Sequence, residues 1–176
     1  MQLKTERLCL RCWIPVDIER FAELHADGRV MKDLGGPLSR AAAEEKLSRY
    51  LKAYERYGYS RWAVETSGDE FIGYVGVYPR HDEPDHPLGR HDEIGWRLFP
   101  KAWGHGYATE AAQAALDDVF ARTEVSEVLS YTAPNNHPSL AVMERLNLTR
   151  DPSRDFVLHD DLDGWVGNVW AILRPG

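Results

Sequence analysis

One segment constrains this chain more than any other: Glu93-Ile-Gly-Trp-Arg-Leu-Phe-Pro-Lys-Ala-Trp-Gly-His-Gly-Tyr-Ala-Thr-Glu. A strand-like run breaks at Pro100, passes through a glycine-punctuated turn, and enters a helix at about Tyr107. Gly104 and Gly106 have no Cβ, so the backbone can take positive φ and a ligand can approach it closely. Free N–H groups at the positive end of a helix dipole form a site for an anion. The sequence therefore predicts phosphate binding at this turn.

The predicted phosphate site consists of backbone amides, with two side chains as further donors. Its residues are Lys101, Trp103, Gly104, His105, Gly106, Tyr107 and Ala108. The alternative is a plain strand–turn–helix connection in which the glycines serve only the turn. A Walker loop is excluded because no Gly-Lys-Ser/Thr sequence follows. A Rossmann fingerprint fails because Thr109 stands where its third glycine would be.

Composition bounds the class of protein. A chain of 176 residues and 20.1 kDa indicates one domain, covering residues 1–176, with a core of its own. The formal net charge of −7, without a basic stripe, argues against nucleic acid as a partner. No run of about 18 apolar residues predicts a membrane span, and the first residues lack the apolar block of a signal peptide. We therefore expect a cytoplasmic protein.

Cys9 and Cys12 have the spacing of a zinc or redox motif. No second pair or histidine partner follows, and residues three apart on a strand point to opposite faces. The sequence favours two reduced, half-buried cysteines.

Hydrophobic periodicity predicts alternating strands and helices. We expect strands at residues 7–13, 61–66, 71–78, 93–99, 127–132, 154–158 and 165–173, with the turn 161–164 between the last two. We expect helices from Pro15, from an N-cap at Ser39 to Gly58, from Tyr107 to about Phe120, and at 139–146. The order β-α-α-β-β-β-α-β-α-β-β predicts a mixed α/β sheet with helices on both faces.

Five landmarks in this order resemble the GNAT superfamily of N-acetyltransferases, in the branch of RimJ and RimL. They are Thr5–Arg11, Phe71–Gly76, Glu93–Trp96, Lys101–Ala108 and Asn136–Leu148. Lys101–Ala108 is similar to the family's Q/R-x-x-G-x-G/A acetyl-CoA signature, and Lys101 departs from it at the first position. A lysine keeps the positive charge but loses the planar fork of arginine. Asn147 replaces a glycine near the end of the last landmark.

The resemblance implies a six- or seven-stranded mixed sheet whose central strands splay apart to hold the pantetheine arm of acetyl-CoA. Backbone groups around Leu98 and Phe99 would contact pantetheine and polarise the thioester carbonyl. Acetyl-CoA would be the co-substrate, with no metal, and transfer would go by direct attack to a primary amine. The leading candidate for the acceptor is a protein or peptide N-terminal amine, and the alternative acceptor is a polyamine or aminoglycoside-like amine. A non-catalytic CoA-binding module and a homodimer both stay open.

Two residues carry the catalytic hypothesis. Glu93 is the candidate base, acting through bridging waters; the alternative is a salt-bridged carboxylate at the end of a strand. Ser139 is the candidate proton donor to the leaving thiolate, by the resemblance, and Tyr131 competes because its phenol is chemically better matched. Asn136 is expected to cap the following helix, to hold the pantetheine amide, or both.

The loop 79–92 gathers three histidines and several carboxylates among three prolines. Its irregular spacing favours a solvated loop over a metal site. Beside the acceptor mouth, such an acidic loop could attract a cationic amine. The acceptor itself would be recognised by this loop and by residues 33–40.

Overall fold

The computed structural model describes residues 1–176 except 33 and 159–163. The described residues form a nine-stranded mixed sheet in the order β1-β2-β3-β4-β5-β6-β9-β7, with β8 paired to β9. The strands are β1 (Gln2–Lys4), β2 (Leu8–Arg11), β3 (Arg61–Thr66), β4 (Phe71–Pro79), β5 (Asp92–Leu98), β6 (Glu127–Thr132), β7 (Thr149–Arg150), β8 (Phe156–Leu158) and β9 (Trp165–Leu173). The expected six or seven strands were too few because β1 and β7 are too short to show a periodic pattern.

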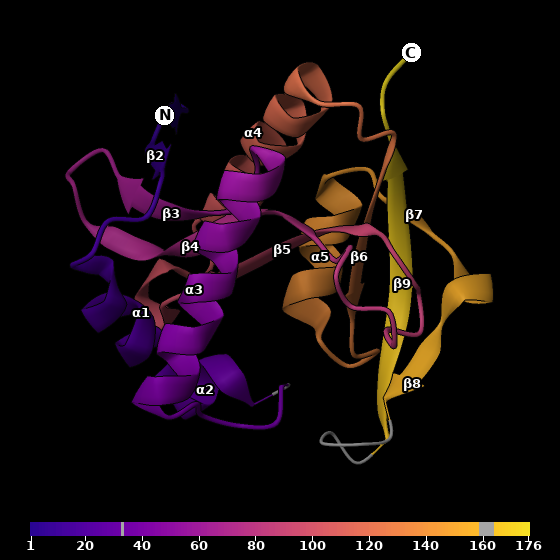
Figure 1. Cartoon of the computed structure of the whole chain (residues 1–176), viewed down its shortest axis with the longest axis horizontal. Helices are drawn as coiled ribbons and strands as arrows, with labels where there is room; N and C mark the ends of the chain where they lie inside the picture. Colours follow the sequence, from indigo (N-terminus) through magenta and orange to yellow (C-terminus); the bar gives the residue numbers. More distant parts are fainter. Residues whose placement is uncertain (33, 159–163) are drawn as a thin grey trace.

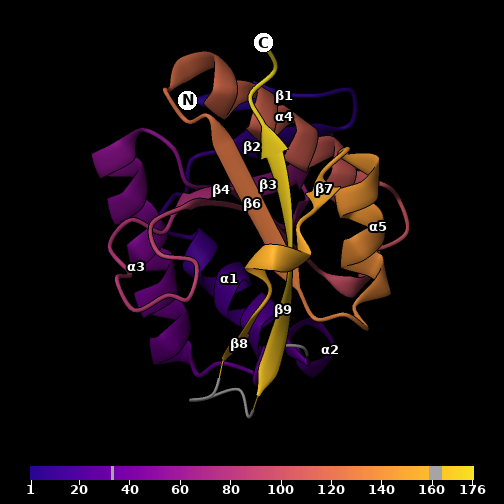
Figure 2. The ribbon, with the colours of Figure 1, turned by 90° about the vertical axis from the view of Figure 1, so that its right-hand side faces the viewer.

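Helices cover both faces of this sheet, which confirms the predicted mixed α/β architecture (Figures 1 and 2). They are α1 (Asp17–Ala26), α2 (Gly28–Met31), α3 (Arg40–Tyr57), α4 (Tyr107–Arg122) and α5 (His137–Arg145), with 3-10 turns at Pro100–Ala102 and Pro152–Arg154. Side chains of α1 and α3 pack with β4 in one core cluster, around Phe21 and Tyr74. Side chains of α4 and α5 pack with the other face, around Leu116 and Met143.

Capping residues set several boundaries where the sequence predicts them. Ser39 Oγ accepts a hydrogen bond from Ala42 N–H at 3.2 Å, and Gly58 ends α3 with φ 78°. Asn147 takes φ 59° after α5, the left-handed conformation expected of it. The helix α5 begins at His137, two residues earlier than predicted, because Asn136 is its N-cap.

Two other boundaries differ from the prediction. Arg154 was expected in a strand but ends a 3-10 turn, and β8 begins only at Phe156. The first strand stops at Arg11, before Trp13.

Cys9 and Cys12 are free thiols. The turn expected at 161–164 lies mostly outside the described residues. Within the described part of the chain, no helix is both long and apolar enough to cross a membrane.

The central strands β5 and β6 separate almost as soon as they meet. β5 pairs with β4 from Asp92 to Leu98, whereas its parallel pairing with β6 has a single register pair, Glu93 with Leu129. Beyond Glu93, the edge of β5 that faces β6 is therefore left without ladder partners. This gap is the splay that the resemblance implied, and it positions the site.

Candidate active site

The turn before α4 presents a row of backbone donors. Gly104 and Gly106 have φ 76° and 78°, and Gly106 is an N-cap without a side-chain cap hydrogen bond. Within the described chain, the N–H groups of residues 104–108 have no acceptor. A Cβ on Gly104 would meet nothing within 4 Å, so this side of the turn is open to a ligand. The Trp103 N–H was predicted as a further donor to the anion, but it already donates to Pro100 O at 3.1 Å.

The two predicted side-chain donors are engaged elsewhere. Lys101 Nζ forms an ion pair with Glu70 on the surface. His105 Nδ1 lies 2.7 Å from Trp103 O, and its ring stacks on Tyr107 with centroids 5.4 Å apart. The turn therefore offers an anion mainly backbone amides and the dipole of α4.

Arg7 and Glu110 complete the turn, and sequence reasoning missed both. Arg7 Nη1 donates to His105 O at 2.9 Å, and its Nη2 pairs with Glu110 at 2.6 Å. The Arg7 guanidinium also lies 4.9 Å from the centre of the Tyr107 ring. The two residues are 103 positions apart, so no local pattern could have paired them. Arg7, paired with Glu110, therefore lies beside the turn before α4.

Of the two residues predicted to contact pantetheine, only one has a free amide toward the gap. Phe99 N–H donates to Ile72 O at 2.9 Å and is not available. Hydrogen-bonding groups alternate along a strand, so the Leu98 N–H turns to the opposite side, toward β6. Leu98 O accepts from the Trp103 indole at 2.8 Å. The Leu98 N–H is therefore the donor that the splayed edge provides.

Glu93 is a buried ion-paired carboxylate at the point where β5 and β6 part. Its Oε1 accepts from Arg61 at 2.8 Å, and its Oε2 pairs with Arg80. Its side chain is 12% exposed and that of Arg61 is 5% exposed. Burial alone would raise the pKa of Glu93, but the charges of Arg80 and Arg61 outweigh it and hold the pKa well below its ordinary value. This is the salt-bridged alternative of the sequence analysis, and such a carboxylate is a weak base.

Tyr131 lies beside Glu93 on β6. Its hydroxyl donates to Glu93 Oε2 at 3.1 Å and lies 3.2 Å from His86 Nε2. Burial and the negative charge of Glu93 raise the pKa of Tyr131 well above its ordinary value. The phenol is thus held by the carboxylate network and is a poor proton donor.

Asn136 caps α5 as predicted. Its Oδ1 accepts from Ser139 N–H at 3.3 Å, and its Nδ2 donates to Thr132 Oγ1 at 2.9 Å. Both polar ends of Asn136 are therefore occupied, and its expected contact with pantetheine stays a prediction. The half-buried Ser139 is held at the first turn of α5, and its hydroxyl makes no hydrogen bond within the described chain.

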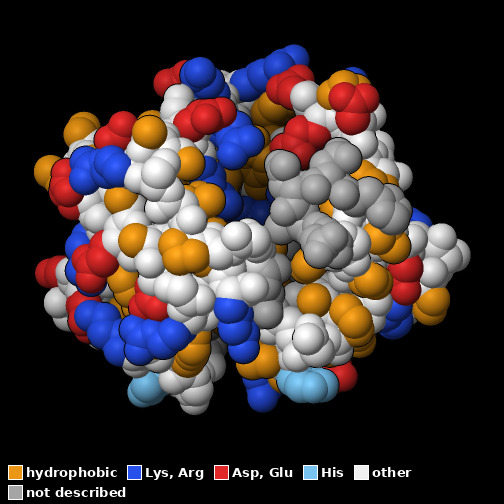
Figure 3. All heavy atoms as spheres, turned by 90° about the horizontal axis from the view of Figure 1, so that it is seen from below, with side chains coloured by type: hydrophobic (Ala, Val, Ile, Leu, Met, Phe, Trp, Pro, Cys, Tyr) orange, Lys and Arg blue, Asp and Glu red, His pale blue; other side chains and the backbone are white. Residues whose placement is uncertain are grey.

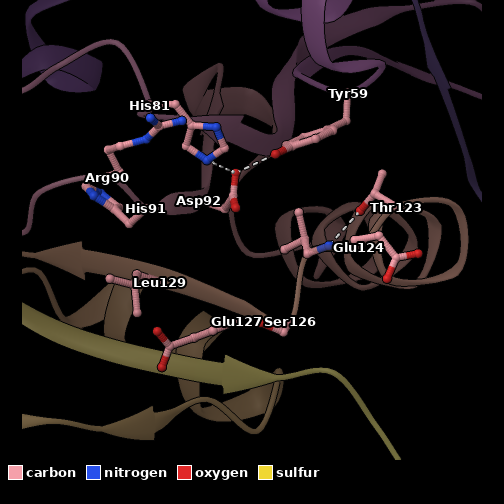
Figure 4. Close-up of a pocket in the computed structure, with 11 residues that line it drawn as sticks. Tyr59, His81, Arg90, His91, Asp92, Thr123, Glu124, Ser126, Glu127 and Leu129 are labelled. Carbon is pink, nitrogen blue, oxygen red and sulfur yellow. Dashed lines mark hydrogen bonds and ion pairs between the residues drawn. The ribbon is translucent and has the colours of Figure 1, made fainter.

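A pocket of 480 Å³ lies at the other end of β5 and β6, where the two strands are still paired (Figure 4). His81 Nε2 and Tyr59 Oη both reach Asp92 Oδ1, at 3.1 and 2.6 Å (Figure 4). Among the described residues, no group of three or more His, Cys, Asp or Glu side chains could hold a metal ion. The histidines of the loop 79–92 instead pack with Tyr131 and Phe156 or pair with Asp92.

Comparison with known proteins identifies the family. Residues 7–149 match the model of the acetyltransferase (GNAT) domain. The chain is 30% identical over 149 residues to YkkB of Bacillus subtilis, covering 84% of each protein. It is similar to the crystal structure of an acetyltransferase from Agrobacterium tumefaciens, with TM-score 0.81, 28% identity, and coverage of 98% of this chain and 94% of that one. It also shares its fold with RimL, a ribosomal alpha-N-protein acetyltransferase solved with coenzyme A, at TM-score 0.79 and 17% identity, over 98% of each chain.

The fold, with its parted strands and amide-lined turn, defines a CoA-dependent acyltransferase. The chain belongs to the GNAT family. It is an N-acetyltransferase that uses acetyl-CoA as co-substrate. The free amides of residues 104–108 fit the phosphates of that co-substrate.

Replacing Glu93 should reveal how strongly the buried ion pairs hold the sheet. Glu93→Gln leaves Arg61 buried without its anion, so we expect unfolding free energy to fall by about 3–5 kcal/mol in denaturant titrations. Because the pKa of Glu93 is lower in the folded state than its unfolded value of about 4.3, the ionised carboxylate stabilises the fold at pH values above about 4.3. This contribution is lost as the pH falls below that value. Glu93→Gln should therefore flatten the acid limb of the stability curve.

Glu70→Gln is the matched control, because Glu70 forms an exposed ion pair with Lys101. This substitution should leave the unfolding midpoint almost unchanged. Equal losses in the two variants would contradict the role assigned to Glu93.

Proposed function

We propose that the protein transfers the acetyl group to the α-amine of a peptide or protein N-terminus, by direct attack in a ternary complex. The observation that carries this proposal is the ion-paired state of Glu93, which makes it a weak base. An α-amine near pKa 8 is deprotonated at pH 7 for about 1.4 kcal/mol, whereas a lysine amine needs about 4.6 kcal/mol. A site without a strong base therefore suits an α-amine as the acceptor. The shared fold with RimL is consistent with this acceptor.

In the proposed complex, the amides of residues 104–108 hold the phosphates of acetyl-CoA at the start of α4. The Leu98 N–H, at the parted edge of β5, polarises the acetyl carbonyl. Acetyl-CoA supplies the acetyl group as an activated thioester. Ser139, whose hydroxyl makes no hydrogen bond among the described residues, gives a proton to the departing thiolate and receives one from the nitrogen that has attacked the carbonyl. Glu93 fixes Tyr131 on the acceptor side.

The runner-up acceptor, a small polyamine or aminoglycoside-like amine, depends on an acidic loop 79–92. The carboxylates of this loop are largely neutralised by internal pairs. Asp82 pairs with Arg56 at 2.7 Å, Glu83 with Arg80 at 2.6 Å, and Asp92 lies against His81. This pairing weakens any attraction for a polycation, so the peptide amine is the better-supported acceptor.

Thiol release from acetyl-CoA tests the acceptor class. We expect short unblocked peptides to be acetylated with kcat/KM well above that of spermidine, an aminoglycoside or Nα-blocked lysine. Mass spectrometry should place the acetyl group on the α-amine. Faster turnover of the aminoglycoside or spermidine would overturn the proposal, and CoA binding without turnover of any amine would indicate a binding module.

Gly104→Ala tests whether the turn binds the co-substrate. Alanine at φ 76° carries about 1–2 kcal/mol of backbone strain, and its Cβ enters the open side of the turn. We expect the Kd for CoA, measured by calorimetry, to rise about tenfold or more. Gly89→Ala is the control, because Gly89 also has a positive φ of 61° and no atom within 4 Å of an added Cβ, but lies outside this turn. A similar Kd in both variants would refute this site.

Ser139→Ala and Tyr131→Phe separate the two candidate proton donors. If Ser139 protonates the thiolate, Ser139→Ala should lower kcat about a hundredfold while the Kd for CoA stays constant. Tyr131→Phe should have a smaller effect on kcat, because the phenol is held by Glu93. The opposite order of effects would assign the role to Tyr131.

A further inference from the structure

On the face of the sheet covered by α1 and α3, two half-buried cations have no carboxylate partner among the described residues. Within the described residues, Arg97 and Lys46 take part in no ion pair, although both side chains are half-buried. Arg97 Nη1 instead donates to the thioether of Met31 at 2.6 Å. Most other arginines of the described chain, including Arg61 and Arg80, are paired with acids. Buried charges in proteins are normally paired, so these two need an explanation.

Lys46 lies among further positive charges. Burial lowers the pKa of Lys46; the neighbouring Tyr74 opposes this shift, and the charges of Arg97, Arg80 and Arg49 add to it. Arg97 is the register partner of Tyr74 on β4, and the ring of Tyr74 packs on that of Tyr50, one helical turn after Lys46 on α3. Although burial opposes it, Arg97 and Lys46 lower the pKa of Tyr74.

The acids near this cluster do not balance it. Glu93 is already shared between Arg61 and Arg80, and Glu83 is paired with Arg80. Among the residues described, no carboxylate therefore balances the positive charge of Lys46 and Arg97.

The cluster lies next to the reaction site. Arg97 precedes Leu98, whose N–H faces the gap, and side chains alternate along β5. Ile94 and Leu98 belong to the core on the α4 side, whereas Arg97 reaches Met31 of α2 on the opposite side. Figure 3 shows Lys and Arg side chains on the wall of a hollow, viewed from the side where α2 and the lower ends of β8 and β9 lie.

We infer that the acceptor carries a carboxylate close to its reacting amine, and that Lys46 and Arg97 bind this carboxylate. The inference rests on the proposed N-acetyltransfer to an α-amine. In a peptide, the carboxylate is an Asp or Glu side chain within the first two residues; a free amino acid offers the same chemistry. Charge-assisted hydrogen bonds in a half-buried site give strong selection for such a group.

Matched peptides test the inference on the wild-type protein. We expect kcat/KM for a peptide beginning Ser-Glu to exceed that of its Ser-Gln counterpart about tenfold or more, the size of a charged hydrogen bond. A Ser-Lys peptide should be the slowest. A higher kcat/KM for phenylalanine than for phenylalaninamide would show that the carboxylate of a free amino acid is recognised.

Variants of the two cations assign the effect. Lys46→Gln and Arg97→Gln should each bring the ratio of kcat/KM for Ser-Glu to kcat/KM for Ser-Gln close to one, and Lys46→Arg should keep the ratio of the wild-type protein. Lys52→Gln is the control, because Lys52 is exposed on the same helix. The Kd for CoA and the unfolding midpoint report whether a variant is folded. Should Lys46→Gln fail to fold, the wild-type peptide pair and Arg97→Gln decide.

Two failures are distinguishable. If peptides are acetylated but Ser-Glu and Ser-Gln turn over equally, the carboxylate inference is overturned while the proposed function stands. If no amine is acetylated, the proposed function fails, and the N-acetylated products are then compared as ligands of the CoA-loaded protein. A thermal shift with N-acetyl-Ser-Glu but not with N-acetyl-Ser-Gln, lost in Arg97→Gln, would support the carboxylate site; equal shifts would refute it.

Discussion

A buried carboxylate between two guanidinium groups holds the point where the sheet divides. Arg61 is on β3, two strands from Glu93, and its side chain crosses the sheet over Gly76 and Gly95, which are register partners. A Cβ on Gly95 would lie 2.8 Å from Arg61 Nη2, so a larger residue there would displace the guanidinium group from this path. The pair Glu93–Leu129 is the single register pair between β5 and β6, and the charges hold the first residue of that pair in place.

Separation of β5 and β6 then produces the two halves of the site. Past Glu93, β5 turns one set of backbone groups to β4 and leaves the other facing the gap, so the Leu98 N–H is available while that of Phe99 is used. The chain next forms the glycine turn and starts α4, which leaves a second row of free amides. Arg7 and Glu110 fix that row by tying the segment before β2 to the first turn of α4. The site is therefore built from backbone, with side chains that hold it in position.

Local patterns predicted the parts that depend on local chemistry. The bounds of β3, β6 and β9 follow from alternation between turn residues, and the start of α4 at Tyr107 follows from Gly106. The state of Glu93 could not be predicted in this way. Its position identified it as a candidate, but the partners that lower its pKa lie 32 and 13 residues away in sequence. The use of the Phe99 amide depends on a tertiary contact with Ile72, and that of the Trp103 amide on the local 3-10 turn from Pro100; periodicity predicts neither.

The excess of positive charge on the acceptor side offers a way to generate the nucleophile without a strong base. A cation close to an ammonium group lowers its pKa, so Arg97 and Lys46 would favour the neutral, reactive amine. The same field would repel an acceptor that carries only an ammonium charge. A carboxylate on the acceptor resolves this conflict, because it binds to the two cations, and the one net positive charge that remains still favours the neutral amine. The positive charges on the acceptor side would then promote deprotonation of the amine, a role that Glu93 cannot fill because it is held in ion pairs.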